Sequence, residues 1–408
     1  MREMKDSGIE WIGDIPVYWK IMPNKYLMRK EKKICPVYHG EDILSLTMKG
    51  VIVRDLDAGG KMPASFDGYQ RLEAGNLLMC LFDIDVTPRC VGLIKQAGVS
   101  SPAYSQFVLR KGADAAYYCY YYTMLDNDKT LLHLAKNLRH SLTEDQLGVI
   151  PVIVPPIEEQ QRIADFLDTK CAEIDARTAD IQTQIDTLEQ YKRSVITETV
   201  TKGLDPDAEM KDSGIEWVGE IPAHWLVHPV YYYYGERKNK NYLGKEDNLL
   251  SLSYGRVVRK DINTSDGLLP ESFNTYNIVE TGDIIIRPTD LQNDKRSLRT
   301  GLVKEHGIIT SAYIDLCPIK QVDSRYFYFL LHAYDVMKVF YNMGNGVRQG
   351  LNYSEFSRLM VFEPPYDEQV AMADYLEAKV EEVDVVISDK KAQLATLDEY
   401  KKSLIFEY

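Results

Sequence analysis

Two long stretches of the chain carry apolar residues every three or four positions, and each stretch follows a Pro-Pro pair. The apolar seam of the first stretch runs through Leu167, Ile174, Ile181, Leu188 and Val195. The seam of the second runs through Leu376, Val383, Leu397 and Leu404. This spacing, sustained over about five heptads, is typical of a coiled coil. It predicts two long helices that pack on each other. The alternative is two amphipathic helices packed separately on their own domains.

The segments between these helices carry strand-like patterns. Residues 43–54 and 249–260 alternate or run apolar and contain β-branched side chains, which predicts strands. Gly75 and Gly282 each precede a short apolar run, as expected for a turn followed by a buried strand.

Three aromatic runs could stack on nucleic-acid bases. For residues 117–122 and their counterpart 326–331, a buried helix is the better interpretation, because the second run continues into His332, Ala333 and Tyr334. For the tetrad at 231–234 we expect a half-buried strand.

The chain is a tandem repeat. Residues 4–19 read MKDSGIEWIGDIPVYW, and residues 210–225 read MKDSGIEWVGEIPAHW. Each long helical stretch opens with the pattern PPxxEQ, at Pro155 and again at Pro364. The segments between these similar ends diverge. A structural scaffold that holds two different recognition surfaces would have this organisation.

We therefore expect an α+β fold in which two mixed α/β domains are joined by two long helices. Two repeats related by a pseudo-twofold axis would make these helices an antiparallel coiled coil. Four polar residues interrupt its seams: Thr178, Lys192, Lys390 and Lys401. The predicted segments are the first domain with its motif, the central helix, a linker with the repeated motif, the second domain and the C-terminal helix, at residues 1–155, 156–202, 203–225, 226–363 and 364–408.

The net charge of −13 is unevenly distributed. The predicted scaffold segments together carry −17, whereas the divergent middles, 20–155 and 226–363, together carry +4. Phosphate binding needs local positive charge and not a positive total. The acidic total therefore does not exclude DNA as a partner of the divergent domains.

Catalytic and metal-binding patterns are largely absent. Glu363-Pro364-Pro365-Tyr366 resembles the tetrapeptide of amino-group DNA methyltransferases, but it has Glu in place of Asn or Asp, and no Gly-rich cofactor loop precedes it. No P-loop, no paired histidine ligands and no CxxC pair occur. We expect no catalytic residue and no metal site on this chain.

The sequence also predicts a compartment. It contains no run of about 18 apolar residues, which excludes a membrane span, and its polar first ten residues lack a signal-peptide core. Six scattered cysteines suit a reducing cytoplasm.

The doubled KDSGIEW(I/V)G(D/E)IPxxW motif and the doubled PPxxEQ helix opening resemble the specificity subunit of type I restriction–modification systems. The resemblance covers the whole chain. Residues 138–142 and 347–351 also resemble the family's segment before the Pro-Pro pair, although Ala135-Lys136-Asn137 replaces the Gly-x-Gly of the family in the first copy.

The resemblance implies a non-catalytic subunit whose two target-recognition domains each read half of a bipartite, asymmetric site in double-stranded DNA. The helices would set the spacer and dock two methyltransferase subunits, which hold S-adenosylmethionine. A restriction and translocase subunit, using ATP and Mg, would complete the complex. A coiled-coil protein-interaction adaptor without a DNA role and a self-sufficient methyltransferase are the alternatives.

Basic and amide side chains of the divergent domains are the DNA-contact candidates, because Arg and Lys bind phosphates and Arg and Gln also read base edges. The candidates are Arg29, Lys30, Arg54, Arg89, Arg139, Arg256, Arg259, Lys260, Arg287, Lys295, Arg296, Arg299, Arg348 and Gln349.

Overall fold

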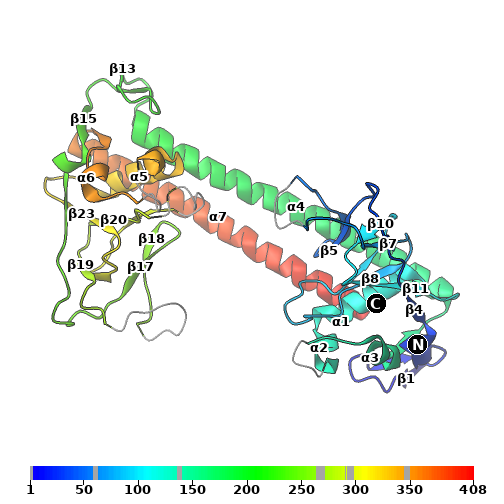
Figure 1. Ribbon diagram of the computed structural model, residues 1–408. Helices are drawn as coiled ribbons and strands as arrows, with labels where there is room; N and C mark the ends of the chain where they lie inside the picture. The colour runs from blue at the N-terminus through cyan, green and yellow to red at the C-terminus, as the bar shows by residue number, and fades with distance from the viewer. Residues whose placement is uncertain are drawn as a thin grey trace. The chain divides into compact units, whose positions relative to one another are not determined.

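The chain contains both helices and short strands, and in each unit a run of strands comes before the α-helices, which confirms the predicted α+β class. The computed structural model describes residues 3–57, 63–135, 140–262, 272–289, 291, 298–343 and 350–408. The chain divides into unit 1, which is Met1–Ile181 with Ala392–Tyr408, and unit 2, which is Gln182–Lys391. Each of the two long helices contributes residues to both units (Figure 1).

Unit 1 opens with short strands and contains the first half of one long helix and the last residues of the other. Its elements are β1 (Met4–Asp6), β2 (Asp14–Pro16), β3 (Lys20–Pro23), η1 (Asn24–Tyr26), β4 (Met28–Glu31), β5 (Leu44–Thr47), β6 (Gly50–Val53), β7 (Gln70–Leu72), β8 (Leu77–Met79), β9 (Val91–Leu93), β10 (Gly98–Ser100), β11 (Ser105–Leu109), α1 (Ala115–Asn127), α2 (Thr130–Leu134), α3 (Glu144–Val149), β12 (Pro151–Val154) and the start of α4 (Ile157–Lys202).

Unit 2 follows the same order, with the 3-10 helix η3 in the place of α2. Its elements after α4 are β13 (Met210–Asp212), β14 (Glu220–Pro222), β15 (Leu226–Pro229), η2 (Val230–Tyr232), β16 (Tyr234–Glu236), β17 (Leu250–Ser253), β18 (Arg256–Arg259), β19 (Asn277–Val279), β20 (Ile284–Ile286), β21 (Thr300–Leu302), β22 (Gly307–Ile309), β23 (Ile314–Pro318), α5 (Ser324–Val336), η3 (Val339–Asn342), α6 (Tyr353–Phe356), β24 (Met360–Glu363) and α7 (Tyr366–Glu407).

Each unit is built on a four-stranded antiparallel sheet, with the order β4-β11-β8-β9 in unit 1 and β16-β23-β20-β21 in unit 2. The inner strands β8 and β20 are buried along their whole length. Each follows a glycine with a positive φ, Gly75 at 87° and Gly282 at 93°, a conformation that other residues rarely adopt. The predicted turn and buried strand are therefore confirmed in both repeats.

The strands predicted at 43–54 and 249–260 form two antiparallel hairpins, β5–β6 and β17–β18. Each hairpin lies close to the outer strand of the sheet, over a glycine. A Cβ on Gly92 would lie 2.8 Å from the Leu46 side chain, and one on Gly301 would meet the Leu252 side chain. Glycine is required at these two equivalent positions because a hairpin and a sheet strand approach each other closely there.

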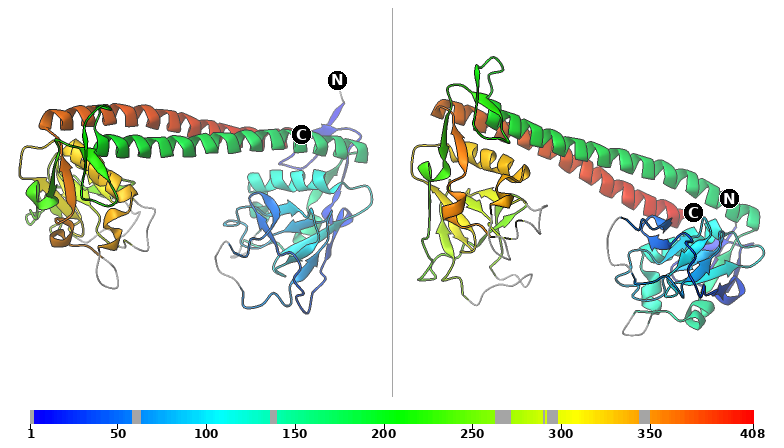
Figure 2. Two further views of the ribbon diagram at one scale, coloured as in Figure 1. Left: turned by 90° about the horizontal axis from the view of Figure 1, so that it is seen from above. Right: turned by 45° about the horizontal axis from the view of Figure 1, so that its top comes forward.

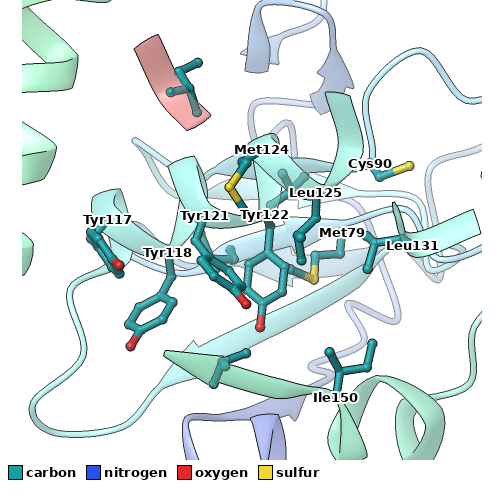
Figure 3. Packing of buried hydrophobic residues seen from close by; sticks show 14 of the residues in the cluster. Met79, Cys90, Tyr117, Tyr118, Tyr121, Tyr122, Met124, Leu125, Leu131 and Ile150 are labelled. Atoms are coloured by element: carbon teal, nitrogen blue, oxygen red, sulfur yellow. The ribbon is translucent and has the colours of Figure 1, made fainter. Parts of the chain in front are cut away.

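The aromatic runs at 117–122 and 326–331 lie in α1 and α5, which confirms the buried-helix interpretation. Tyr118 and Tyr122 have no exposed surface. The Tyr118 hydroxyl donates to the Ile153 carbonyl oxygen at 3.0 Å, and that of Tyr122 to Asn24 Oδ1 at 2.6 Å. Figure 3 shows these tyrosines along α1 within the core of unit 1.

The expectation of a strand over residues 231–234 was wrong for most of the tetrad. Val230–Tyr232 form the 3-10 helix η2, and only Tyr234 lies in a strand, β16. Pro229 fixes the extended backbone that precedes the helical turn, with φ −70°. Tyr233 and Tyr234 are buried in the core of unit 2, whereas Tyr231 is exposed.

Helices α4 and α7 pack on each other as an antiparallel pair, which excludes separate packing. In unit 1 early α4 meets late α7, where Asp175 pairs with Lys401 at 2.6 Å. In unit 2 late α4 meets early α7, where Lys192 pairs with Asp384 at 2.5 Å. The predicted seam residues are buried or half-buried without exception. Figure 2 shows the helices side by side in both views.

Candidate nucleic-acid interface

The tryptophan that ends each repeated motif holds the start of a long helix. Trp19 Nε1 donates to Glu159 Oε2 at 3.0 Å, and Trp225 Nε1 donates to Glu368 Oε2, also at 3.0 Å. Both glutamates belong to the PPxxEQ pattern. The two motifs that repeat in the sequence are therefore direct partners in the structure, and we call each pair a Trp–Glu clamp.

The glutamine of PPxxEQ joins the same helix start to the aromatic helix of its unit. Gln160 donates to the Pro155 carbonyl oxygen at 2.7 Å and accepts from the Asp114 backbone N–H at 2.8 Å. Gln369 does the same with Pro364 at 2.9 Å and Asp323 at 3.0 Å. Asp114 and Asp323 are the N-cap residues of α1 and α5. Each side-chain amide thus links the starts of two helices.

The lysines that interrupt the coiled-coil seams are bonded across the helix pair. Lys401 and Lys192 occupy equivalent repeat positions, and their partners Asp175 and Asp384 are equivalent as well. Lys390 donates to Gln184 Oε1 at 2.5 Å. Polar residues at such positions fix the register of a helix pair. Equivalent Lys–Asp pairs, one in each unit, therefore fix the register of the two long helices.

Two loops meet at the end of the inner strand in each unit. In unit 2, the Leu351 backbone N–H donates to the Pro288 carbonyl oxygen at 3.0 Å, and in unit 1 Leu142 donates to Leu81 at 2.8 Å. The segment before the Pro-Pro pair thereby lies beside the loop that leaves β8 or β20. Several DNA-contact candidates belong to these loops by sequence, and the structure brings the described ends of the loops together.

Five candidates lie outside the described residues: Arg139, Lys295, Arg296, Arg348 and Gln349. The other nine occupy three settings, which are an edge strand, the hairpins and the paired loops.

The edge-strand candidates are found only in unit 1. Arg29 and Lys30 lie exposed on β4 at the edge of the four-stranded sheet. Arg29 pairs with Glu31 at 3.3 Å, and Lys30 lies 3.9 Å from Glu144. Surface pairs of this kind contribute about 0–1 kcal/mol, so a phosphate can displace the carboxylate at low cost.

The hairpin of unit 2 carries two largely exposed arginines. Arg256 and Arg259 lie on β18 with side chains that are 67% and 72% exposed. Arg256 pairs with Asp384 of α7 at 2.5 Å, and Arg259 makes a forked contact with Glu305. Lys260 follows the hairpin β17–β18, and its unit 1 counterpart Arg54 follows β5–β6. The backbone N–H of each residue donates to the carbonyl oxygen of the residue just before its hairpin, Leu249 or Ile43.

The loop candidates differ sharply in exposure. Arg287 is partly exposed at the end of β20, where its backbone N–H donates to the Arg299 carbonyl oxygen at 2.8 Å. Arg89 is partly buried against α1, where it donates to Asn127 Oδ1 at 2.9 Å.

Arg299 has no exposed surface. Its guanidinium donates to Tyr341 Oη at 3.0 Å and contacts the Thr289 carbonyl oxygen. This position suits a role in the core of unit 2 better than a direct DNA contact.

The sequence motifs did not indicate the buried aspartate that lies behind the loop after β8 or β20 in each unit. Asp126 accepts from the Cys90 backbone N–H at 2.9 Å, and the equivalent Asp335 accepts from that of Arg299. Both carboxylates are buried, and burial raises the pKa of Asp335. Extending the repeat through α1 and α5 would have aligned these two residues, so the signal was present in the sequence.

The described residues contain no cluster of three or more His, Cys, Asp or Glu side chains suited to a metal ion. Nor does any helix in the described ranges combine the length and apolar character that crossing a bilayer requires.

Residues 91–187, from β9 to the middle of α4, match the family model of the type I restriction modification DNA specificity domain. Over these residues, the match confirms the resemblance drawn from the repeated motifs.

A putative type I restriction enzyme MjaX specificity subunit from Methanocaldococcus jannaschii is 24% identical over 271 residues. These residues are 65% of this chain, and the chain spans 60% of the length of that relative.

A solved structure has the same fold. A chain from a study of complex assembly and conformational transition of the type I R-M system overlays with a TM-score of 0.68 and 11% identity, covering 96% of this chain and 97% of that chain. The HsdS subunit from Thermoanaerobacter tengcongensis gives a TM-score of 0.46 at 11% identity, with 96% of each chain covered.

Proposed function

We propose that this chain is the DNA sequence-specificity subunit of a type I restriction–modification complex. The observation that carries the proposal is the doubled Trp–Glu clamp, which holds two different sets of loops on one pair of helices. In this proposal, residues 1–155 and 226–363 form the two target-recognition domains. Each domain reads one half of a bipartite, asymmetric site.

The divergence of the paired loops supports two separate specificities. Between the equivalent positions Cys80 and Cys90, the unit 1 loop contains Arg89 but also Asp83 and Asp85. The unit 2 loop, residues 287–299, contains four basic and two acidic residues. Direct readout depends on side chains that reach base edges, so loops of such different charge suit different sequences.

The exposed arginines of the hairpin β17–β18 supply phosphate contacts. Arg256 and Arg259 are held by Asp384 and Glu305 in the free chain, and exchanging a surface carboxylate for a phosphate costs little. Such contacts position a protein on the duplex without reading its sequence.

The helix pair sets the distance between the two half-sites and docks two methyltransferase subunits. Helix α4 has 46 residues, which corresponds to about 69 Å at 1.5 Å per residue. One of its two seams is apolar at every heptad position from Leu167 to Val195, as a spacer helix requires.

The chain contributes recognition and no catalysis. The methyltransferase subunits bring S-adenosylmethionine, and a restriction and translocase subunit uses ATP and Mg. The complex acts in the cytoplasm, and the six cysteines, none of them in a disulfide, suit a reducing compartment.

The direct test is to assemble the chain with its methyltransferase, measure DNA binding over a range of salt concentrations, and map the methylated sites in a host. We expect affinity to fall with salt and the methylated sites to share two fixed sequences separated by a constant gap. A coiled-coil adaptor without a DNA role would show no salt-dependent DNA binding and no common site.

The spacer role has its own test. Deleting the central heptads Thr178–Gln184 and Ile387–Gln393 keeps the seams and leaves the pairs Asp175–Lys401 and Lys192–Asp384 in place. The helix pair shortens by about 10 Å. Since the duplex rises about 3.4 Å per base pair, the optimal gap should shrink by roughly three base pairs. Affinity should also fall, because three base pairs turn the duplex by about 100°. An unchanged optimal gap in a complex that still assembles would contradict the spacer role.

A further inference from the structure

Each unit carries a β-hairpin whose inner face is the same in both repeats. In unit 2 the strand register of β17–β18 places Leu252 opposite Val257, on the face toward the sheet. Their counterparts in β5–β6 of unit 1, Leu46 and Val51, are the same residues in the same register. Each pair packs over the glycine of the neighbouring sheet strand. Packing of the hairpin on its sheet is therefore shared by the two units.

The outer face of the hairpin differs between the units. Because side chains alternate along a strand, the residues between the inner ones point away from the sheet. These outer positions are Ser45, Thr47, Gly50 and Ile52 in unit 1 and Ser251, Ser253, Arg256 and Val258 in unit 2. Apart from the two serines, the residues differ. Ile52 and Val258 are each 41% exposed. The hairpin thus combines a shared packing face with an outer face that is particular to each unit.

The turn of each hairpin presents a large exposed side chain. Tyr254 is 90% exposed, and Met48, its counterpart in unit 1, is 60% exposed. The backbone of Tyr254 has a φ of 47°, a left-handed conformation that is unfavourable for a bulky side chain. Asparagine or glycine would suit this position of a hairpin turn better. Folding of the turn therefore does not explain why a tyrosine is there.

The turn of β17–β18 lies beside the loop to which the proposed function assigns base recognition. A Cβ added to Gly255 would be 3.1 Å from the Leu298 side chain, close to the end of loop 287–299. The Tyr328 hydroxyl of α5 donates to the Gly255 carbonyl oxygen at 3.1 Å and holds the turn in place. Tyr254, the preceding residue of the turn, therefore lies at the edge of that loop.

The outer faces suit DNA better than a partner protein. Two copies of one protein would contact two like surfaces, whereas the two halves of an asymmetric DNA site need unlike ones. Basic side chains lie on both hairpins, with Arg256 largely exposed in unit 2 and Lys49 exposed at the turn in unit 1. Such charge suits the phosphate backbone. A two-stranded ribbon, whose strands lie about 5 Å apart, fits the major groove of B-DNA, which is about 12 Å wide.

We propose that the outer face and turn of each hairpin enter the major groove and read base edges in the half-site of their own unit. The hydroxyl groups of Ser45 and Ser251 hydrogen-bond to base edges, and Ile52 and Val258 contact thymine methyl groups. Arg256 binds a phosphate and positions the hairpin. This role rests on the proposed function, and it adds a second reading element to the loops that follow β8 and β20.

The test uses the full chain assembled with its methyltransferase. Tyr254→Asn and Val258→Ala change the hairpin of unit 2, and Met48→Ala and Ile52→Ala are the matched changes in unit 1. All four side chains are exposed, so thermal unfolding should change little, and it should rise slightly for Tyr254→Asn, because asparagine suits a left-handed turn. Binding is measured to the mapped site, to sites with one changed base pair, and to unrelated DNA.

Each variant should reduce the preference for the mapped site over one of the singly changed sites by about tenfold. The affected base pair should lie in one half-site for the unit 1 variants and in the other for the unit 2 variants. Binding to unrelated DNA should stay the same, because the substituted side chains carry no charge.

Unchanged preferences in all four variants of a complex that still recognises its site would overturn base reading by the hairpins and leave the DNA role intact. An equal loss of affinity for every DNA sequence would overturn it as well, because such a loss indicates phosphate contacts alone. A wild-type complex that recognises no common site would contradict the proposed function itself, and the hairpin role with it.

Discussion

The two units have the same strand order, but they place different polar side chains at one equivalent buried position of the sheet. On the inner strands of unit 1, Asn76 Nδ2 donates to Gln106 Oε1 at 3.2 Å. Gln106 also accepts from the Glu73 backbone N–H at 2.8 Å and donates to the Arg71 carbonyl oxygen at 3.1 Å. Every polar atom of this buried glutamine amide is therefore used, and the position is electrically neutral.

Unit 2 places two carboxyl groups at the same position. Asp283 receives a forked contact from Arg237, at 2.7 and 3.0 Å. Asp315 is buried beside it, and both of its oxygens lack a hydrogen-bond partner among the described residues. Arg237 Nε lies 3.9 Å from Asp315 Oδ2. The apolar core and the strand pairing are therefore the same in the two units, whereas the buried polar side chains differ.

The largest expected difference between the units concerns the clamp tryptophans. Trp225 is fully buried against Gly203 and Phe362, whereas Trp19 borders a cavity. Trp225→Ala should lower the free energy of unfolding of unit 2 by about 3–5 kcal/mol, the range for truncation of a buried tryptophan. Trp19→Ala should lower the free energy of unfolding of unit 1 by less, because part of the Trp19 surface borders the cavity formed by the described residues.

Hydrogen exchange reported separately for each unit measures both effects. Equal losses in the two variants would show that the cavity does not weaken the packing of Trp19.

The second difference separates folding from DNA contact within one loop. Arg299→Ala should destabilise unit 2 by about 3–5 kcal/mol, because it removes a buried charged donor from Tyr341 Oη and from the Thr289 carbonyl oxygen. Arg287→Ala should leave stability within about 0.5 kcal/mol, as surface substitutions do. It should weaken DNA binding by about 1–3 kcal/mol if it contacts a base.

Thermal unfolding and DNA titration of both variants check this division. An Arg287→Ala variant that unfolds early but binds DNA normally would reverse the assignment.

The third and smallest effect depends on pH. Burial raises the pKa of Asp315 to about 8, and the neighbouring carboxylate of Asp283 adds to the shift. Because the folded-state pKa lies above the ordinary value of 3.8, this group favours the folded state most below about pH 4. That contribution is lost as the pH rises through about 8.

Asp315→Asn should therefore stabilise unit 2 by about 1–3 kcal/mol at pH 8 and have little effect near pH 4. Gln106→Glu in unit 1 is the matched control, because it introduces a buried carboxyl group. It should destabilise unit 1 at pH 8 and have little effect near pH 4. Denaturant unfolding at several pH values measures both, and a pH-independent Asp315→Asn effect would contradict the buried-carboxyl account.

The sequence predicted the scaffold well because its signals are periodic or local. The heptads identified both long helices, and glycine followed by an apolar run identified β8 and β20. Tyr231–Tyr234 was misjudged because β propensity is set by context, and Pro229 starts a helical turn there.

Long-range polar partners could not be predicted from the sequence. Nothing local to Arg299 indicates that Tyr341 and Asp335 enclose it, and the basic cluster around it suggested a surface. The Trp–Glu clamps join residues that are 140 and 143 positions apart, and only the fold brings them together.

The central claim is that each unit reads its own half of the DNA site on a shared scaffold. The most direct measurement replaces residues 226–363 with the equivalent segment of a related subunit, assembles the hybrid with the methyltransferase, and maps the methylated sites. The account predicts that one half-site changes while the other half-site and the gap stay the same. A change in both halves, or in neither, from a complex that still methylates DNA would contradict it.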